Sequence, residues 1–185
     1  MLESIFVALF FFAPAGIANM WPILAAKTPG LAKLSYPMDF NKTLNGKRIF
    51  GDHKTIRGFV AGFFGALAML AIQVNWYESS AWIRADVAYM DYTAINIWLW
   101  AFVFDLGVLG GDALKSFFKR QFDRPPGAAW FPFDQLDYVV GGILTSLLVI
   151  RLEPFDYFMI ALVWFALHPL ATGIGYLLKL KDSPL

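Results

Sequence analysis

The chain has 185 residues and a formal net charge of +1, and 58% of its residues are hydrophobic while only 16% are charged. An average soluble domain carries about 25% charged residues, and a disordered chain is far less apolar. The composition therefore excludes disorder and disfavours a soluble globule. The absence of cysteine excludes disulfides and thiolate metal sites, and two distant histidines do not favour a histidine metal site. A polytopic membrane protein is the class that remains.

Five apolar segments follow one another along the chain, each close to the ~20 residues that a membrane helix needs. They cover approximately residues 2–24, 58–74, 93–111, 135–150 and 155–178. Because no sustained alternation of apolar and polar residues is present, helices rather than strands are indicated. Glu3 stands where a cleavable signal would be basic, so we expect the first segment to be retained. The sequence predicts one all-α membrane domain over residues 1–185 with five transmembrane helices.

Basic residues are concentrated in three of the connections between these segments. Residues 25–57, residues 112–137 and the chain after residue 178 together hold all Lys and Arg except Arg84 and Arg151. With five spans, these three stretches share one side, and the positive-inside rule makes that side cytoplasmic. We therefore expect a multi-pass protein of the cell (inner) membrane with an external N-terminus and a cytoplasmic C-terminus. Its active site would lie in two functional cytoplasmic loops, 25–57 and 112–137.

The first cytoplasmic stretch contains a compact basic motif, Asn45-Gly-Lys-Arg-Ile-Phe-Gly-Asp-His-Lys-Thr-Ile-Arg-Gly58. Glycines let backbone N–H groups approach an anion closely, and the start of the second helix would add its own free N–H groups. The motif is not a P-loop, and an ordinary positive-inside loop is the alternative. The residues expected to bind a polyphosphate are Lys47, Arg48, Gly51, His53, Lys54, Thr55, Arg57 and Gly58.

Polar residues also interrupt the apolar helices. Asp105 lies inside the third segment, where a carboxylate is costly, and Asp112, Ser116 and Lys119 follow it on the same helical face. This spacing predicts a polar stripe that runs from the membrane to the cytoplasmic surface. Asp105 alone has a simpler explanation, a hydrogen bond to another helix, for example through Asn19. Asn19 itself is expected to pack across the bundle or to line the substrate cavity.

Two carboxylates, Asp134 and Asp137, stand at i and i+3 where the fourth segment begins. One explanation is helix capping, since an acidic side chain satisfies free N–H groups in a first turn. The other is a divalent cation. Hard oxygen ligands without histidine or cysteine indicate Mg²⁺, which usually holds one or two carboxylates and the phosphates of a substrate. We favour the metal for Asp137 and hold both explanations for Asp134.

In combination, these motifs resemble the signature of the CTP-dependent phosphatidate cytidylyltransferases. The resemblance rests on Gly111-Asp-Ala-Leu-Lys-Ser-Phe-Phe-Lys-Arg120, Pro126-Gly127 and Asp134-Gln-Leu-Asp137. The upstream Phe50-Gly-Asp-His-Lys-Thr-Ile-Arg-Gly58 is similar to the short five-span branch, the CDP-archaeol synthases. The chain lacks the Lys-Asp pair and the Asp-Arg-x-x-Asp ending of typical bacterial and eukaryotic enzymes. It therefore matches the archaeal branch better, and the chains and glycerol stereochemistry of its lipid stay open.

The resemblance implies that CTP and a phosphatidate-like lipid give CDP-lipid and pyrophosphate in the membrane. It implies Mg²⁺ on Asp112, Asp134 and Asp137, and no nucleic-acid partner, while assembly as a homodimer stays open. No general base is needed, because a phosphate monoester is already an anion at neutral pH. The implied catalytic residues are Asp112, Ser116, Lys119, Arg120, Asp134 and Asp137, with Gly127 in the nucleotide site.

A small transporter or channel for an anionic solute is the alternative function, with Asp105 as its coupling residue. Against it, the polar residues gather on one side of the membrane, and the chain has no inverted repeat. Two other lipid enzyme families are disfavoured because their motifs are missing. The chain has neither the aspartate pattern of the CDP-alcohol phosphotransferases nor the Pro-Ser-Gly-His setting of a lipid phosphatase. Dependence on CTP separates the cytidylyltransferase from the transporter.

Overall fold

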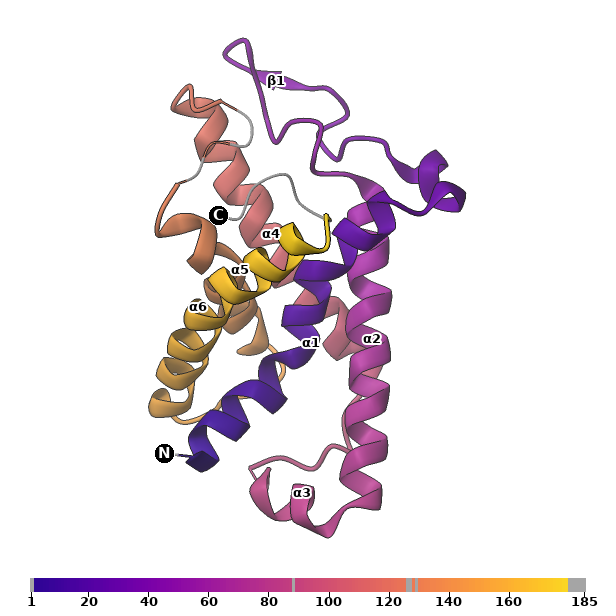
Figure 1. The fold of residues 1–185 in the computed structure, drawn as a ribbon, viewed down its shortest axis with the longest axis vertical. Coiled ribbons are helices and arrows are strands. Elements are labelled where there is room, and N and C mark those ends of the chain that lie inside the picture. Colours follow the sequence, from indigo (N-terminus) through magenta and orange to yellow (C-terminus); the bar gives the residue numbers. More distant parts are fainter. Residues whose placement is uncertain (1, 88, 126–127, 129, 180–185) are drawn as a thin grey trace.

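The computed structural model describes every residue except 1, 88, 126–127, 129 and 180–185, and the described chain is predominantly helical (Figure 1). Its elements, in chain order, are α1 (Leu2–Ala26), the 3-10 helix η1 (Pro29–Leu34), β1 (Thr43–Leu44), β2 (Lys47–Arg48), α2 (Ile56–Ser79), α3 (Ala81–Asp86), α4 (Ile97–Gln121), α5 (Phe133–Ser146) and α6 (Pro154–Leu177). The two short strands pair antiparallel, with Thr43 opposite Arg48. The predicted all-α class is thus confirmed, apart from this small hairpin.

Four of these helices, α1, α2, α4 and α6, are long and apolar enough to cross a membrane. The fourth predicted span, 135–150, corresponds to α5, which has only 14 residues and ends at Ser146. At 1.5 Å per residue such a helix is about 21 Å long, whereas the hydrocarbon core of a bilayer is about 30 Å thick. Helix α5 by itself is therefore too short to cross, and five crossings stay a prediction.

Helix α4 differs most from its predicted span of residues 93–111. It begins later, where the side chain of Asn96 accepts the N–H groups of Trp98 and Leu99 at 3.1 and 3.2 Å. It also continues ten residues further, so residues 112–121 are helical rather than part of a loop. The apolar stretch ends at Gly111, but the good helix formers that follow carry the helix beyond the apolar boundary.

The two basic connections meet at one end of the molecule. Figure 1 shows β1 and the end of α4 at that end, and α3 at the opposite end. The ammonium of Lys47 lies 2.8 Å from the carbonyl oxygen of Gln121 and 2.7 Å from Asp123 Oδ2, which joins the two connections directly. The shared location of the two loops agrees with the charge pattern. Which end faces the cytoplasm stays a prediction.

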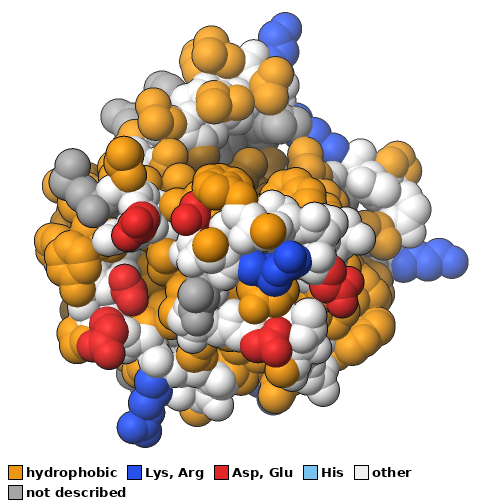
Figure 2. Space-filling model, turned by 90° about the horizontal axis from the view of Figure 1, so that it is seen from below, with side chains coloured by type: hydrophobic (Ala, Val, Ile, Leu, Met, Phe, Trp, Pro, Cys, Tyr) orange, Lys and Arg blue, Asp and Glu red, His pale blue; other side chains and the backbone are white. Residues whose placement is uncertain are grey.

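The opposite end has a different surface. Figure 2 shows it from below, with acidic side chains spread among hydrophobic ones. Large apolar side chains also point outward along the helices, among them Phe64, Phe102, Leu144, Phe158 and Leu162. A soluble protein rarely exposes so much contiguous apolar surface. These side chains suit contact with lipid, and they leave the interior of the bundle to the residues that position the site.

The interior is built around α4. Phe104 and Val108 are fully buried, and the ring of Phe104 meets Phe11 and Phe12 of α1 edge-on, with centroids 5.6 and 6.0 Å apart. Val139 of α5 is buried in the same cluster. Aromatic edge contacts of this kind add stability beyond the area they bury. They hold α1 and α5 on α4.

Three glycines bring α4 and α5 into backbone contact. A side chain on Gly107 would collide with the Gly141 carbonyl group, one on Gly141 with Gly107, and one on Gly111 with the carbonyl oxygen of Asp137. Small residues spaced four apart let two membrane helices approach this closely. As a consequence, the end of α4 beyond Gly111 lies directly against the first turns of α5.

Candidate active site

A cluster of three carboxylates forms where α4 meets α5, and a single lysine lies at its centre. Lys115 Nζ is 3.1 Å from Asp112 Oδ1, 3.0 Å from Asp134 Oδ1 and 2.6 Å from Asp137 Oδ2. Asp112 and Lys115 come from α4, whereas the other two carboxylates come from the first turns of α5. The glycine contact between the helices therefore assembles the cluster.

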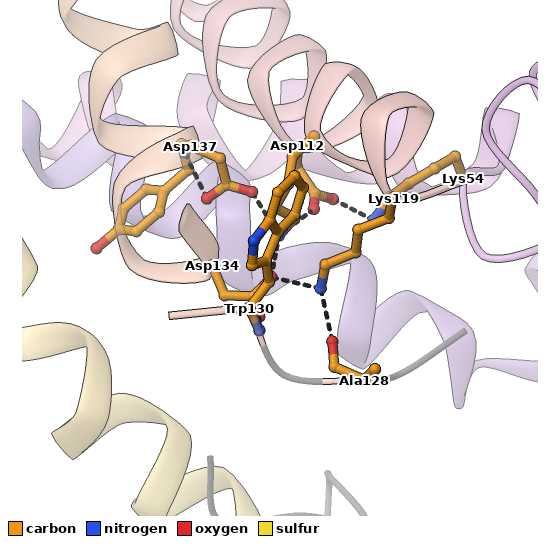
Figure 3. A network of polar contacts seen from close by, with 9 residues as sticks. Lys54, Asp112, Lys119, Ala128, Trp130, Asp134 and Asp137 are labelled. Atoms are coloured by element: carbon orange, nitrogen blue, oxygen red, sulfur yellow. Dashed lines mark hydrogen bonds and ion pairs between the residues drawn. The ribbon is translucent and has the colours of Figure 1, made fainter. Parts of the chain in front are cut away.

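Two further lysines complete its charge balance (Figure 3). Lys54, from the segment before α2, forms an ion pair with Asp112. Lys119 Nζ lies 2.7 Å from Asp134 Oδ1 and 2.8 Å from the carbonyl oxygen of Ala128. Three ammonium groups thus face three carboxylates, which lowers the high cost of placing charges in a partly buried setting.

The carboxylate of Asp134 takes part in this network and does not cap the N-terminus of α5. The N-cap residue is Pro132, and no side chain caps it. The carboxylate of Asp134 accepts the backbone N–H of Trp130 at 2.5 Å. Partial burial raises the pKa of Asp134, but hydrogen bonds from Lys119 and Lys115 outweigh burial and hold this pKa below its usual range. The group is therefore ionised at neutral pH.

A polar pocket of about 330 Å³ opens beside the cluster. From the segment before α2 it is lined by Arg48, Phe50, Gly51, Asp52, His53 and Lys54. From α4 it is lined by Asp112, Lys115, Ser116, Lys119 and Arg120. The two motifs that the sequence singled out separately thus form one cavity. Arg120 also lines the pocket, and its Nε is buried without a hydrogen-bond partner among the described residues.

The wall formed by the segment before α2 is organised by Asp39, whose side chain is fully buried. Its oxygens accept from Arg48 Nε and Nη2 at 3.2 and 2.8 Å and from the backbone N–H groups of Phe50 and Gly51 at 3.0 and 2.9 Å. Burial raises the pKa of Asp39, but the Arg48 guanidinium and the backbone donors outweigh it and hold this pKa well below its usual range. Asp39 therefore orients Arg48 toward the pocket.

Several predicted residues lie outside the polar pocket. Lys47 bridges the loops, as described above, and Thr55 caps α2 by accepting the N–H of Gly58 at 3.2 Å. Arg57, the second residue of α2, lines a separate cavity of about 370 Å³ whose other walls are mostly apolar. Lys54, three residues earlier, lines the polar pocket instead. The segment 54–57 thus contributes cations to two different cavities.

Three further expectations have different outcomes. Asn19 lines a third cavity, about 210 Å³ in volume, between α1 and α6, together with His168. Asp105 is buried against Gly62 of α2, and Asp105 Oδ1 has no hydrogen-bond partner in the described structure. The expected hydrogen bond to Asn19 is therefore not seen at that oxygen. Gly127 lies outside the described residues.

The donor set of the cluster suits a hard cation, because it consists of carboxylate oxygens that point to one place. In the part of the chain that the structure describes, however, no group of three or more His, Cys, Asp or Glu side chains has the arrangement that would hold a metal ion. The Lys115 ammonium lies between the carboxylates, within 2.6 to 3.1 Å of an oxygen of each. Mg²⁺ at Asp112, Asp134 and Asp137 therefore stays a prediction.

A family model described as CarS-like, CDP-archaeol synthase, matches residues 1–185. The chain belongs to the CDP-archaeol synthase family. Curated CDP-archaeol synthases are similar over nearly their whole length. The one from Methanopyrus kandleri is 35% identical over 95% of this chain and 91% of its own, and the one from Pyrobaculum islandicum is 34% identical over 95% and 98%. The one from Halobacterium salinarum is 33% identical over 91% and 96%.

A solved structure of an intramembrane enzyme for archaeal membrane lipids biosynthesis also resembles this chain. Its TM-score is 0.68 at 28% sequence identity, and the match covers 92% of this chain and 94% of that one. Together, these comparisons confirm that this member of the CDP-archaeol synthase family is a multi-pass membrane protein. They also confirm the predicted enzyme class, a CTP-dependent lipid cytidylyltransferase.

Lys115 and Asp39, which organise the site in this CDP-archaeol synthase family member, are not among the predicted residues. Lys115 has a signal in the sequence, because it stands at i+3 from Asp112 within the motif Gly111–Arg120. Asp39 has no such signal. It lies in an irregular segment nine residues before Arg48, and only the folded loop brings the two together.

Proposed function

We propose that this protein transfers the cytidylyl group of CTP to the phosphate of an archaeal-type ether lipid, giving CDP-lipid and pyrophosphate. The observation that carries the proposal is the polar pocket itself, which is lined by cationic side chains from two distant segments and opens beside a carboxylate cluster at one end of a helical membrane protein. Such an arrangement suits a ligand that bears several phosphate groups.

The triphosphate of CTP would bind along the cationic wall of this pocket. Arg48, Lys119 and Arg120 line it, and a guanidinium offers paired donors to phosphate oxygens. Ser116 adds a hydroxyl on the same face of α4. Fixed donors in a partly buried pocket stabilise the charge that develops on the departing pyrophosphate without reorganisation at the moment of reaction.

The chemical step is an in-line displacement at the α-phosphorus of CTP. An oxygen of the lipid phosphate forms the new bond to this phosphorus, while the bond to the bridging oxygen of the β-phosphate breaks and pyrophosphate leaves. Catalysis of this kind depends on positioning and on charge neutralisation. The lipid phosphate is already anionic, so no side chain has to remove a proton. Asp112, Asp134 and Asp137 would hold Mg²⁺, which supplies charge neutralisation at the phosphates when bound.

The lipid phosphate would be held by Arg57. This residue lines the cavity formed by α1, η1 and α2, whose walls include Trp21, Leu31 and Phe64. A single cation among apolar side chains suits a phosphate that carries long hydrocarbon chains. Lys54 lies three residues before Arg57 and faces the polar pocket, so the start of α2 would bring the two substrates together.

The alternative transport function receives less support. Asp105, its predicted coupling residue, lines none of the three cavities and is packed against α2.

The cytoplasmic orientation of the active site rests on the distribution of basic residues. It is part of the proposal.

Purified protein in detergent or liposomes, supplied with labelled CTP and Mg²⁺, tests the proposal. We expect release of pyrophosphate and formation of CDP-lipid with an archaeal-type ether lipid phosphate, and none when the lipid is omitted. A phosphatidate with ester chains serves as the matched comparison for substrate choice. Absence of CTP turnover with either lipid, in protein that is folded, would contradict the proposed function.

A further inference from the structure

Lys115 makes a contact that no other residue of the site makes. Its ammonium touches all three carboxylates, whereas Lys54 and Lys119 each pair with one of them. The side chain is only 14% exposed, so the contacts are held in a partly buried setting. Lys115 therefore links Asp112 of α4 to both carboxylates of α5.

Without such a cation the cluster would not stay together. Three carboxylates at these distances repel one another, and burial strengthens the repulsion because fewer waters screen it. Lys54 and Lys119 lie at the edges of the cluster and leave Asp137 without an ammonium of its own among the described residues. The ammonium of Lys115 neutralises the carboxylate charge of Asp137, which Lys54 and Lys119 do not pair with.

The same ammonium occupies the position that a divalent cation would need. Its distances to the three oxygens run from 2.6 to 3.1 Å, whereas Mg²⁺ binds oxygen at about 2.0–2.1 Å. An ion at this point could not coexist with the ammonium there, and the oxygens would have to move inward. Lysine suits an exchange of this kind because its compact charge sits on a flexible stem, and Lys115 also lines the polar pocket into which it could turn.

We propose that Lys115 is a positioning residue, a built-in counter-ion that assembles the three carboxylates in the nucleotide-free protein and leaves their centre when a divalent cation binds. This inference rests on the proposed function in one respect, the use of a divalent cation by these carboxylates. The ammonium and the ion then compete for one place. Removal of the ammonium should make the place available to a metal in the absence of nucleotide.

The test measures binding of Mn²⁺ alone, by electron paramagnetic resonance, to the purified full-length chain without CTP. We expect Lys115→Met to bind Mn²⁺ more tightly than the wild type, by about tenfold or more, because a like charge has been removed from the site of the ion. Lys115→Arg keeps the charge and should bind no more tightly than the wild type. Lys42→Met removes an exposed charge elsewhere in the loop and should not change Mn²⁺ binding.

Thermal unfolding supplies the second measurement. Lys115→Met should unfold at a lower temperature than the wild type in metal-free buffer, and Mn²⁺ should restore its midpoint by replacing the ammonium. Unchanged or weaker Mn²⁺ binding by Lys115→Met would overturn the inference, and so would a destabilised variant that Mn²⁺ does not restore. Pyrophosphate release by the wild type is scored separately, so an active wild type with either of these results leaves the proposed function standing.

Discussion

The ammonium of Lys54 pairs with the carboxylate of Asp112, which lies 58 residues further along the chain. This contact joins the segment before α2 to the second half of α4. Both residues line the polar pocket, so the two sequence motifs meet there. Arg57 lies only three residues after Lys54 but lines the apolar cavity instead.

This separation predicts that the two cations serve different substrates. Lys54→Ala should raise the KM for CTP, and Arg57→Ala should raise the KM for the lipid phosphate. The loss of a charge-assisted contact corresponds to about 1.5–3 kcal/mol in each case. Steady-state kinetics with each substrate varied in turn measure the effect. Equal effects of both substitutions on CTP alone would show that Arg57 belongs to the nucleotide site.

The carboxylates of α5 provide a test of metal binding against a structural role. Asn preserves the size of Asp and one acceptor oxygen, but it replaces the other oxygen by an NH2 donor and removes the charge on which Mg²⁺ depends. Asp137→Asn should therefore abolish CTP-dependent pyrophosphate release at ordinary Mg²⁺, with little change in the thermal unfolding midpoint. Asp134→Asn should do the same. Asp156→Asn, in the first turn of α6, is the matched control. Near-normal turnover by Asp137→Asn would refute the assignment of Asp137 as a metal ligand.

The contact between α4 and α5 can be tested with two glycines of one helix. Gly107 has no room for a side chain against Gly141, whereas a side chain on Gly110 would meet nothing within 4 Å. Gly107→Ala should destabilise the protein by about 1–3 kcal/mol through overpacking and should reduce turnover by displacing the carboxylates of α5. Gly110→Ala should be neutral or stabilise by up to about 1 kcal/mol. Unfolding in detergent distinguishes the two, and equal midpoints would contradict the packing argument.

The ion pair between Asp39 and Arg48 should make the stability of the protein depend on pH. The pKa of Asp39 is lowered in the folded state, because the Arg48 guanidinium and the backbone N–H donors together outweigh the effect of burial. The ionised group therefore stabilises the fold above its unfolded pKa of about 3.9, and this stability is lost as the pH falls toward the folded pKa. Asp39→Asn should lower the unfolding midpoint and raise the KM for CTP at pH 7, with a difference in midpoint that shrinks below pH 4. A difference independent of pH would exclude the ion pair as its cause.

The orientation of the molecule can be tested by labelling. Single cysteines at Lys42 and Asp123, in the two basic connections, should react only with reagent delivered from the cytoplasm. A cysteine at Asp86, in the last turn of α3, should react from the outside. Labelling of position 42 or 123 from outside intact cells would end the five-span topology.

Local sequence patterns predict most of the long helices and one face of the candidate site. The spacing of Asp112, Ser116 and Lys119 follows the helical period, so their common face was predictable before any fold was known, and all three line the pocket. The apolar segments likewise predicted the long helices, because a membrane helix needs about 20 consecutive apolar residues. Hydropathy located the end of α4 poorly, because the end of an apolar stretch is not the end of a helix, and residues 112–121 continue it.

Only the tertiary structure decided how the site is assembled. The convergence of three carboxylates on Lys115 depends on how closely α4 and α5 approach. Two glycines of α4 and one of α5 together set this distance. The separation of Lys54 from Arg57 likewise depends on Thr55, which ends the extended segment and starts α2 between them. Contacts of these kinds arise between segments far apart in the chain. Their energies depend on packing in three dimensions, and the spacing of residues along one helix or loop does not contain that information.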